Sequence, residues 1–281
     1  MTKSALIPEN MPEKLRENGF LVIELQHETS EKVAGVFAAG SRFFHLPSDE
    51  KAASKLPNDF GYRPIGIEYS NSPDHPDLAE SFSMCARMSG TVELESSAAC
   101  FLYQRMLETF DAFESIAEAV TVRLAETLSG NAVGGKLRSG FHRWSRLQLN
   151  YSRPLEINEP FINEPHEDGD VLTIACATGP GLELKRVDGD FSPMTTSPTE
   201  ALLMPGEIAW LLSGGHLQPV WHRVRPQPHA TERMALLFFG DLDPQLCEPW
   251  VRNKVNASVD ISERVLKSVT RFGLQGFSLE E

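Results

Sequence analysis

The chain lacks the features that would place it in a membrane, in a disulfide-rich fold or on nucleic acid. No run among its 281 residues approaches the 18 or so consecutive apolar positions that a membrane-spanning helix needs. It has only four cysteines and no C-x-x-C pair, which favours reduced thiols over disulfides or a zinc cluster. Lysine and arginine total 26 against 39 aspartates and glutamates, so the net charge of −13 disfavours nucleic acid or an anionic membrane as a partner.

The N-terminal stretch also lacks the apolar core of a secretion signal, and prolines occur early, at Pro8 and Pro12. We therefore expect a cytoplasmic protein that binds neither membrane nor nucleic acid. The content of 41% hydrophobic and 23% charged residues is typical of a globular protein. Nothing in the composition indicates an oligomeric state.

The hydrophobic periodicity changes near the middle of the chain. Helical spacing predicts a short helix from Pro12 that stops at Gly19, helices over 31–44 and 101–128, and a last helix over 258–275. From residue 147 the period becomes two, and Gly, Pro and Asp separate the short apolar runs. These predicted strands are 147–151, 172–176, 182–184, 201–204, 208–212, 219–224 and 234–239. Many short strands of this kind indicate a sandwich or barrel.

The fold class we predict is mainly β with flanking helices (α+β), organised as one domain over residues 1–281. Residues 1–135 form a mostly helical N-terminal layer with the first strands, and residues 136–250 form the β core. Residues 251–281 form a C-terminal helix. The core should carry any site, because the most informative polar residues lie there.

The stretch that stands out is His166-Glu167-Asp168, just before a predicted strand. Alternate side chains of an extended chain share a face, so His166 and Asp168 point the same way. They supply two of the three ligands of a 2-His-1-carboxylate facial triad, the arrangement typical of non-haem Fe(II). His222 alternates with Val220 and Val224, so it faces inward and is the candidate third ligand. Taken alone, the pair also fits a turn aspartate beside a surface histidine.

Further motifs, in chain order, resemble those of the isopenicillin N synthase-like branch of the Fe(II)/2-oxoglutarate-dependent dioxygenases. They are NGFLVI (18–23), FFHLP (43–47), GY (61–62), ESF (80–82), LNY (149–151), HEDGDVLT (166–173), GLEL (181–184), PGE (205–207), HRV (222–224) and RMALLFF (233–239). The resemblance covers nearly the whole chain, and it implies a double-stranded β-helix, or jelly-roll, core.

The resemblance also implies roles for individual residues. His166, Asp168 and His222 would be the metal and catalytic residues that bind Fe(II). Arg233 would pair with the distal carboxylate of the cosubstrate 2-oxoglutarate, with Tyr151 or its neighbour Asn150 as a further contact. Tyr151 fits a core tyrosine almost equally well. Ala235 stands where the family has a serine that binds the same carboxylate.

The substrate pocket that the resemblance implies has five candidate residues, of which four belong to the loops and first strands of the N-terminal layer. They are Phe60, Tyr62, Arg63, Phe82 and Phe239. Arg63, Arg146 and Arg153 are candidates for meeting an anionic substrate, although each also fits a solvated surface charge. Asp170, where the family has an apolar residue, fits a solvated turn or an acceptor for a metal-binding histidine.

The implied reaction is oxidation, most simply hydroxylation, of a small-molecule metabolite by dioxygen, with succinate and carbon dioxide as co-products. Ala235 leaves open an isopenicillin N synthase-like oxidase or cyclase that uses dioxygen without 2-oxoglutarate. A non-catalytic jelly-roll binding protein and a zinc hydrolase are the remaining alternatives. The sequence does not identify the substrate.

Overall fold

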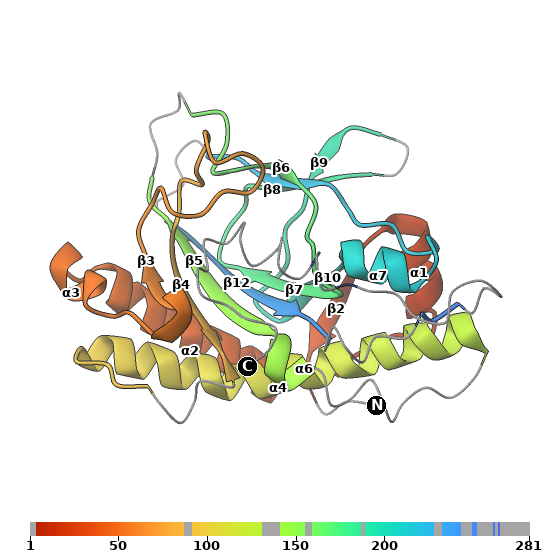
Figure 1. Cartoon of the computed structure of the whole chain (residues 1–281), viewed down its shortest axis with the longest axis horizontal. Helices are drawn as coiled ribbons and strands as arrows, with labels where there is room; N and C mark the ends of the chain where they lie inside the picture. The colour runs from red at the N-terminus through yellow and green to blue at the C-terminus, as the bar shows by residue number, and fades with distance from the viewer. Residues whose placement is uncertain are drawn as a thin grey trace.

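Two antiparallel sheets face each other and form the core of the chain (Figure 1). The computed structural model describes residues 4–86, 92–130, 141–154, 159–186, 189–227, 232–242, 249–251, 261 and 264. The predicted helix over 258–275, and with it the segment 251–281, lies outside these residues except for positions 251, 261 and 264. The two facing sheets form the predicted jelly roll.

The larger sheet has eight strands, four of which come from the N-terminal third of the chain. Their order is β1 (Ala5–Leu6), β2 (Leu21–Leu25), β10 (Glu200–Pro205), β7 (Leu172–Ala177), β12 (Arg233–Gly240), β5 (Arg146–Ser152), β4 (Glu80–Cys85) and β3 (Gly61–Arg63). The N-terminal residues therefore extend both edges of the sheet as well as supplying helices.

The smaller sheet has four short strands, in the order β6 (Asn163–His166), β11 (His222–Val224), β8 (Leu182–Lys185) and β9 (Phe191–Pro193). Figure 1 shows it above the larger sheet, with the segment between β3 and β4 close to β6. The helices are α1 (Met11–Asn18), α2 (His27–Phe44), α3 (Ser48–Ala52), α4 (Ser97–Ser129), α6 (Phe141–Trp144) and α7 (Glu207–Leu212), with a 3-10 turn at Pro57–Asp59.

The long helix α4 has clear end signals. Ser96 caps its start, with Oγ accepting from the backbone N–H of Ala99, and Gly130 ends it with a φ of 68°. Its buried residues include Phe110 and Phe113, whose rings lie 5.2 and 6.2 Å from that of Phe238 on β12. This helix and α2 pack together beneath the larger sheet (Figure 1). None of the described helices is both long enough and apolar enough to cross a membrane.

The two faces of the larger sheet differ, and β5 shows this most clearly. Leu147, Leu149 and Tyr151 belong to the hydrophobic core between the sheet and the helices. Gln148 and Asn150 point the other way and line a cavity between the two sheets. Because strand side chains alternate, the same strand builds a dry core on one side and a polar cavity wall on the other.

One predicted strand is a helix. The apolar run at 208–212 forms α7, and the backbone N–H groups of Glu207 and Ile208 donate to the carbonyls of Asp168 and Asp170. A short apolar run does not distinguish a strand from a buried helix by periodicity alone. Here the tertiary partner decides, because α7 satisfies two carbonyls of the segment that carries Asp168.

Candidate metal centre and cavity

Three side chains that are far apart in the sequence converge in the cavity between the sheets. His166 ends β6 and His222 begins β11, and the two residues are direct partners in the pairing of these strands. Oδ1 of Asp168 lies 3.9 Å from Nε2 of His166 and 3.8 Å from Nε2 of His222. One ligand atom from each residue lies within 4.8 Å of the others, so the three could hold one metal ion.

Backbone carbonyls fix which nitrogen of each imidazole is available. Nδ1 of His166 lies 2.6 Å from the carbonyl oxygen of Glu164, and Nδ1 of His222 lies 3.1 Å from that of Val220. A carbonyl oxygen only accepts, so in the neutral form of each imidazole Nδ1 carries the hydrogen and Nε2 keeps its lone pair. The lone pairs needed for a metal therefore belong to the two atoms that face Asp168.

The carboxylate of Asp168 is buried and oriented. Thr173 on β7 donates its hydroxyl to Oδ2 over 2.6 Å, which leaves Oδ1 for the imidazoles. Burial alone would raise the pKa of Asp168, but the charges of His222 and His166 and the Thr173 hydrogen bond hold it below its usual value. Asp168 is therefore ionised at neutral pH, as a metal ligand must be.

Asp170 is not a solvated turn residue, which was one of the two alternatives that the sequence left open. It is 1% exposed, and its oxygens lie 3.0 and 3.2 Å from the hydroxyl of Thr173. Burial and the charge of Asp168 raise the pKa of Asp170 well above its usual value. The hydroxyl of Thr173 therefore lies between the carboxyl groups of Asp170 and Asp168 and is within hydrogen-bond distance of both. A side chain at Gly206 would meet the backbone oxygen of Asp170, so this glycine permits the close approach of α7.

The cavity beside these residues has a volume of about 860 Å³, counted to its open mouth. Part of its wall is apolar and comes from β8, β10, β11 and the turn after β9: Leu182, Met194, Leu202, Met204 and Val224. Another part is polar and comes from β5, β6 and the segment between β3 and β4: Glu68, Ser70, Asp77, Gln148, Asn150 and Asn163.

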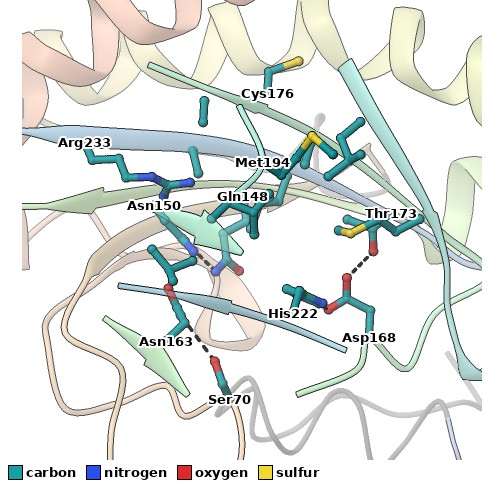
Figure 2. A pocket seen from close by; sticks show the side chains of 18 of the residues that line it. Ser70, Gln148, Asn150, Asn163, Asp168, Thr173, Cys176, Met194, His222 and Arg233 are labelled. Atoms are coloured by element: carbon teal, nitrogen blue, oxygen red, sulfur yellow. Dashed lines mark hydrogen bonds and ion pairs between the residues drawn. The ribbon is translucent and has the colours of Figure 1, made fainter. Parts of the chain in front are cut away.

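Arg233 is the first residue of β12 and also lines the cavity. Its Nε donates to the carbonyl oxygen of Pro180 over 3.1 Å, and no carboxylate of the described residues lies within ion-pair distance. Burial lowers its pKa to about 10, so the guanidinium is charged at neutral pH. Figure 2 shows it on the side of the cavity that carries Asn150, away from Asp168 and His222. Arg233 is half-buried, and a partly desolvated cation on a cavity wall suits an acidic ligand.

Three other predicted residues also line the cavity. Asn150, Ala235 and Phe239 do so from β5 and β12, and the guanidinium carbon of Arg146 lies 4.3 Å from the ring centroid of Phe239. The methyl group of Ala235 is cross-strand from Asn150.

The expectation that Tyr151 contacts the cosubstrate is wrong. Its ring stacks on Phe44 at 4.8 Å on the helix side of the sheet, and its hydroxyl donates to Oε1 of Glu232 over 2.9 Å. The core tyrosine alternative therefore holds. Strand alternation gives the reason, because Asn150 and Tyr151 cannot both face the cavity.

Three predicted substrate residues are also core residues. Phe60, Tyr62 and Phe82 are each at most 7% exposed and pack in the hydrophobic core, where Phe43 contacts the rings of Tyr62 and Phe82. The hydroxyl of Tyr62 donates to Glu80 over 2.6 Å. Their rings are buried between the sheet and the helices. Burial there removes more apolar surface from water, and so stabilises the fold more, than a position on a wet cavity wall would.

The arginines predicted to meet an anionic substrate are engaged elsewhere. Arg63 is buried and pairs with Glu68, and Arg153 pairs with Glu80 on the helix side of the sheet. Arg146 is buried, with Asp241 and Asp170 among its charged neighbours.

Five polar residues of the cavity wall were not predicted from the sequence: Glu68, Ser70, Asp77, Gln148 and Asn163. Gln148 could have been found, because it shares the polar face of β5 with Asn150. Glu68 lies in a segment with no periodic signal, so nothing in the sequence indicated its place.

Two family models together match most of the chain. Residues 134–241 match the model described as 2OG-Fe(II) oxygenase superfamily, and residues 4–98 match the model described as non-haem dioxygenase in morphine synthesis N-terminal. No curated protein is similar enough in sequence to match.

Several solved structures share the fold at low sequence identity. A full-length protein of Neurospora crassa, in complex with alpha-KG, is 17% identical with a TM-score of 0.76, covering 92% of this chain and 88% of its own. A 2OG-Fe(II) oxygenase family protein of Caulobacter crescentus is 19% identical with a TM-score of 0.71, covering 92% of each chain. The rice dioxygenase for auxin oxidation is 19% identical with a TM-score of 0.66, covering 86% of this chain and 80% of its own.

Proposed function

Because the chain belongs to the 2OG-Fe(II) oxygenase superfamily, we propose that it hydroxylates a small-molecule metabolite in the cavity between the sheets. It is a dioxygenase whose cofactors are Fe(II) and 2-oxoglutarate. When bound, they activate dioxygen for the oxidation of a C–H bond, and succinate and carbon dioxide are the co-products. That the substrate is a small metabolite and that the reaction is a hydroxylation are our proposal.

The donor set fits the metal. His166, Asp168 and His222 would hold Fe(II) through two Nε2 atoms and Oδ1, the ligand types that a facial triad uses. The backbone carbonyls at positions 164 and 220 hold the imidazoles in the required tautomer. Three ligands from one side leave the other side of the ion to the cavity, where reactants can enter.

The polar end of the cavity fits the cosubstrate. Arg233 would bind the distal carboxylate of 2-oxoglutarate in the charge-assisted way that a planar guanidinium allows. Asn150 offers an amide N–H beside it, because its Oδ1 already accepts from Gln148 over 2.8 Å. Leu202 and Met204 line the same cavity with apolar side chains, which disfavours water there.

One observation carries this proposal: the three metal-binding side chains and a charged Arg233 without a carboxylate partner among the described residues line the same cavity. A hydrolase or a binding module has no need of that combination. Arg233 also favours the use of 2-oxoglutarate despite the alanine at position 235. The serine hydroxyl that Ala235 replaces would add only about 1 kcal/mol to the binding of the cosubstrate.

The test is anaerobic titration of the protein with Fe(II) and 2-oxoglutarate, followed by the weak visible charge-transfer band of the chelate. We expect the band in the unaltered protein and in His216→Ala, an exposed histidine outside the cavity. We expect none in His222→Ala. A folded protein without the band, or a band that survives in His222→Ala, would contradict the assignment.

The substrate is then sought by screening small metabolites for coupled succinate formation. Thymine and 5-formyluracil are reasonable first members, because the Neurospora crassa protein was crystallised with each of them. Auxin is another, because two relatives are named for its oxidation. The low identity to these relatives shows only a shared fold, so the compounds open the screen and do not define it.

A further inference from the structure

Five residues form a connected polar surface on one side of the cavity, which we call the polar wall: Glu68, Ser70, Asp77, Gln148 and Asn163. Figure 2 shows Ser70, Gln148 and Asn163 on the side of Asn150, with Asp168, Thr173 and His222 across the cavity from them. None of the five belongs to the candidate metal centre or contacts Arg233 through a hydrogen bond among the described residues.

Glu68 is the charged centre of the polar wall, and its charge is already balanced. Arg63 donates to its Oε1 through Nε over 2.8 Å and through Nη2 over 2.5 Å, and Ser81 donates to the same oxygen. Gln148 donates to the other oxygen, Oε2, over 2.7 Å. Arg63 does not line the cavity. The surface that faces a ligand is therefore a neutralised carboxylate with spare accepting capacity on Oε2.

The orientation of the amides follows from these bonds. Nε2 of Gln148 donates both to Glu68 and to Oδ1 of Asn150, so its two hydrogens are used. Its Oε1 lies 3.5 Å from Nη2 of Arg63 and keeps a second lone pair. Nδ2 of Asn163 lies 3.3 Å from the hydroxyl oxygen of Ser70, and that hydroxyl donates to Asp77 over 2.9 Å. Asn163 also forms a side-chain hydrogen bond with Asp77, so the oxygens of Gln148 and Asn163 are the atoms left for a ligand.

The groups that the polar wall offers to a ligand are therefore almost all acceptors, and no cation is available with them. Arg233 is the sole lysine or arginine among the described residues that line the cavity. The proposed function assigns it to 2-oxoglutarate. A second carboxylate entering the cavity would face Glu68 and Asp77 with nothing to neutralise it, which is costly at low dielectric.

The cavity wall formed by Leu182, Met194 and Leu202 is apolar. A ligand that fills the space must then carry hydrogen-bond donors on one edge and present an apolar surface elsewhere.

We propose that the polar wall binds the substrate, and that the substrate is a small, uncharged molecule with amide-type N–H donors on one edge, such as a lactam or an imide. This inference rests on the proposed function where it assigns Arg233 to the cosubstrate. It names Glu68, Gln148 and Asn163 as the residues that select the substrate. It excludes free carboxylic acids as the preferred class.

The experiment compares matched probes on the same ring, nicotinamide against nicotinate and isonicotinamide against isonicotinate, none of which can chelate the metal. Binding to the anaerobic Fe(II)–2-oxoglutarate protein is measured by calorimetry. We expect each amide-type probe to bind at least about tenfold more tightly than its carboxylate partner, the effect of about 1.4 kcal/mol. Equal binding, tighter binding of the carboxylates, or no binding of the amide-type probes would overturn the inference.

Two variants of one residue sharpen the test. Asn163→Leu should weaken the amide-type probes several-fold, and Asn163→Lys should shift the preference toward the carboxylates. Gln218→Leu, which removes an exposed amide outside the cavity, is the control and should change neither. Unchanged probe binding in both Asn163 variants would overturn the inference even if the wild-type preference holds.

The charge-transfer titration separates this inference from the proposed function. If the band forms but the amide preference is absent, the function stands and the inference fails. If the band does not form, the function fails, and the probe preference measured on metal-free Arg233→Gln decides the inference, because Arg233 is then absent as a partner for the carboxylates.

Discussion

The hydroxyl of Thr173 donates to Oδ2 of Asp168 over 2.6 Å, across the gap between β7 and the end of β6. The bond fixes which carboxylate oxygen faces the two imidazoles. Residues that orient a metal ligand in this way typically contribute about 10- to 100-fold to metal affinity. Thr173 is thus a positioning residue for the metal centre.

We predict that Thr173→Val weakens Fe(II) binding by about 10- to 100-fold, because Asp168 loses its only hydroxyl donor among the described residues. Thr173→Ser keeps the hydroxyl and should stay close to wild type. The measurement is the dissociation constant from anaerobic metal titration. A valine variant within twofold of wild type would show that the carboxylate is held by other means.

We predict that Arg233→Gln raises the KM for 2-oxoglutarate by about 10- to 100-fold, since a hydrogen bond to a charged group contributes about 1.5–3 kcal/mol. The metal ligands are untouched, so Fe(II) affinity without the cosubstrate should not change. Steady-state kinetics and metal titration measure the two effects separately. Loss of both together would indicate a general disturbance of the fold.

Ala235→Ser offers a gain-of-function test at the position where the family pattern has a hydroxyl. Ala235 lines the cavity on the strand that carries Arg233. We predict that the serine tightens 2-oxoglutarate binding about fivefold, equivalent to about 1 kcal/mol. Titration of the charge-transfer band with 2-oxoglutarate measures it. Weaker binding would mean that the cosubstrate lies away from this part of β12.

Asp77 should make stability depend on pH. Burial raises its pKa to about 6, although bonds from Ser70 oppose the shift, so below that pH the folded protein holds a proton that the unfolded chain releases. Stability from this group is therefore gained as the pH falls from about 7.5 to about 4.5, by about 2 kcal/mol. We predict that Asp77→Asn lacks this pH-dependent part of the free energy of unfolding. Urea unfolding of both proteins at the two pH values measures the difference, and parallel behaviour would refute it.

The buried pair of Lys51 and Glu80 should be important for stability on the helix side of the sheet. Lys51 is 1% exposed and also donates to the carbonyl of Phe44. We predict that Lys51→Met lowers the free energy of unfolding by about 3 kcal/mol, because the carboxylate of Glu80 loses its buried cationic partner. The matched control is Arg153→Met, whose exposed side chain pairs with the same glutamate and should cost less than about 1 kcal/mol. Urea denaturation distinguishes the two.

The sequence predicted the parts of the fold that have short-range signals. The helix of α4 and the β-rich second half follow from periodicity and from residues such as Gly19 and Gly130. The convergence of His166, Asp168 and His222 followed from strand alternation combined with the family resemblance. These residues lie on or beside strands, where neighbours in the sequence determine the direction of a side chain.

The errors come from choices that only tertiary packing makes. The alternation of side chains along a strand predicts that Asn150 and Tyr151 face opposite sides of the sheet, but it does not predict which side packs against the helices. The stacking of Tyr151 on Phe44 decides that. Glu68 could not be found, because its position depends on its bonds to Arg63 and to the distant Gln148. The run at 208–212 became helical because α7 serves the carbonyls beside Asp168.

His222 and His166 are direct partners in the β6–β11 ladder. A slip of that ladder by one residue would turn every side chain of the short strand β11 to its opposite face and carry one imidazole out of the cavity. Insertions or deletions between the two strands are therefore tolerated only if they leave the pairing unchanged, and an edge-strand error during folding would yield a protein that retains its helices and has lost its capacity for iron.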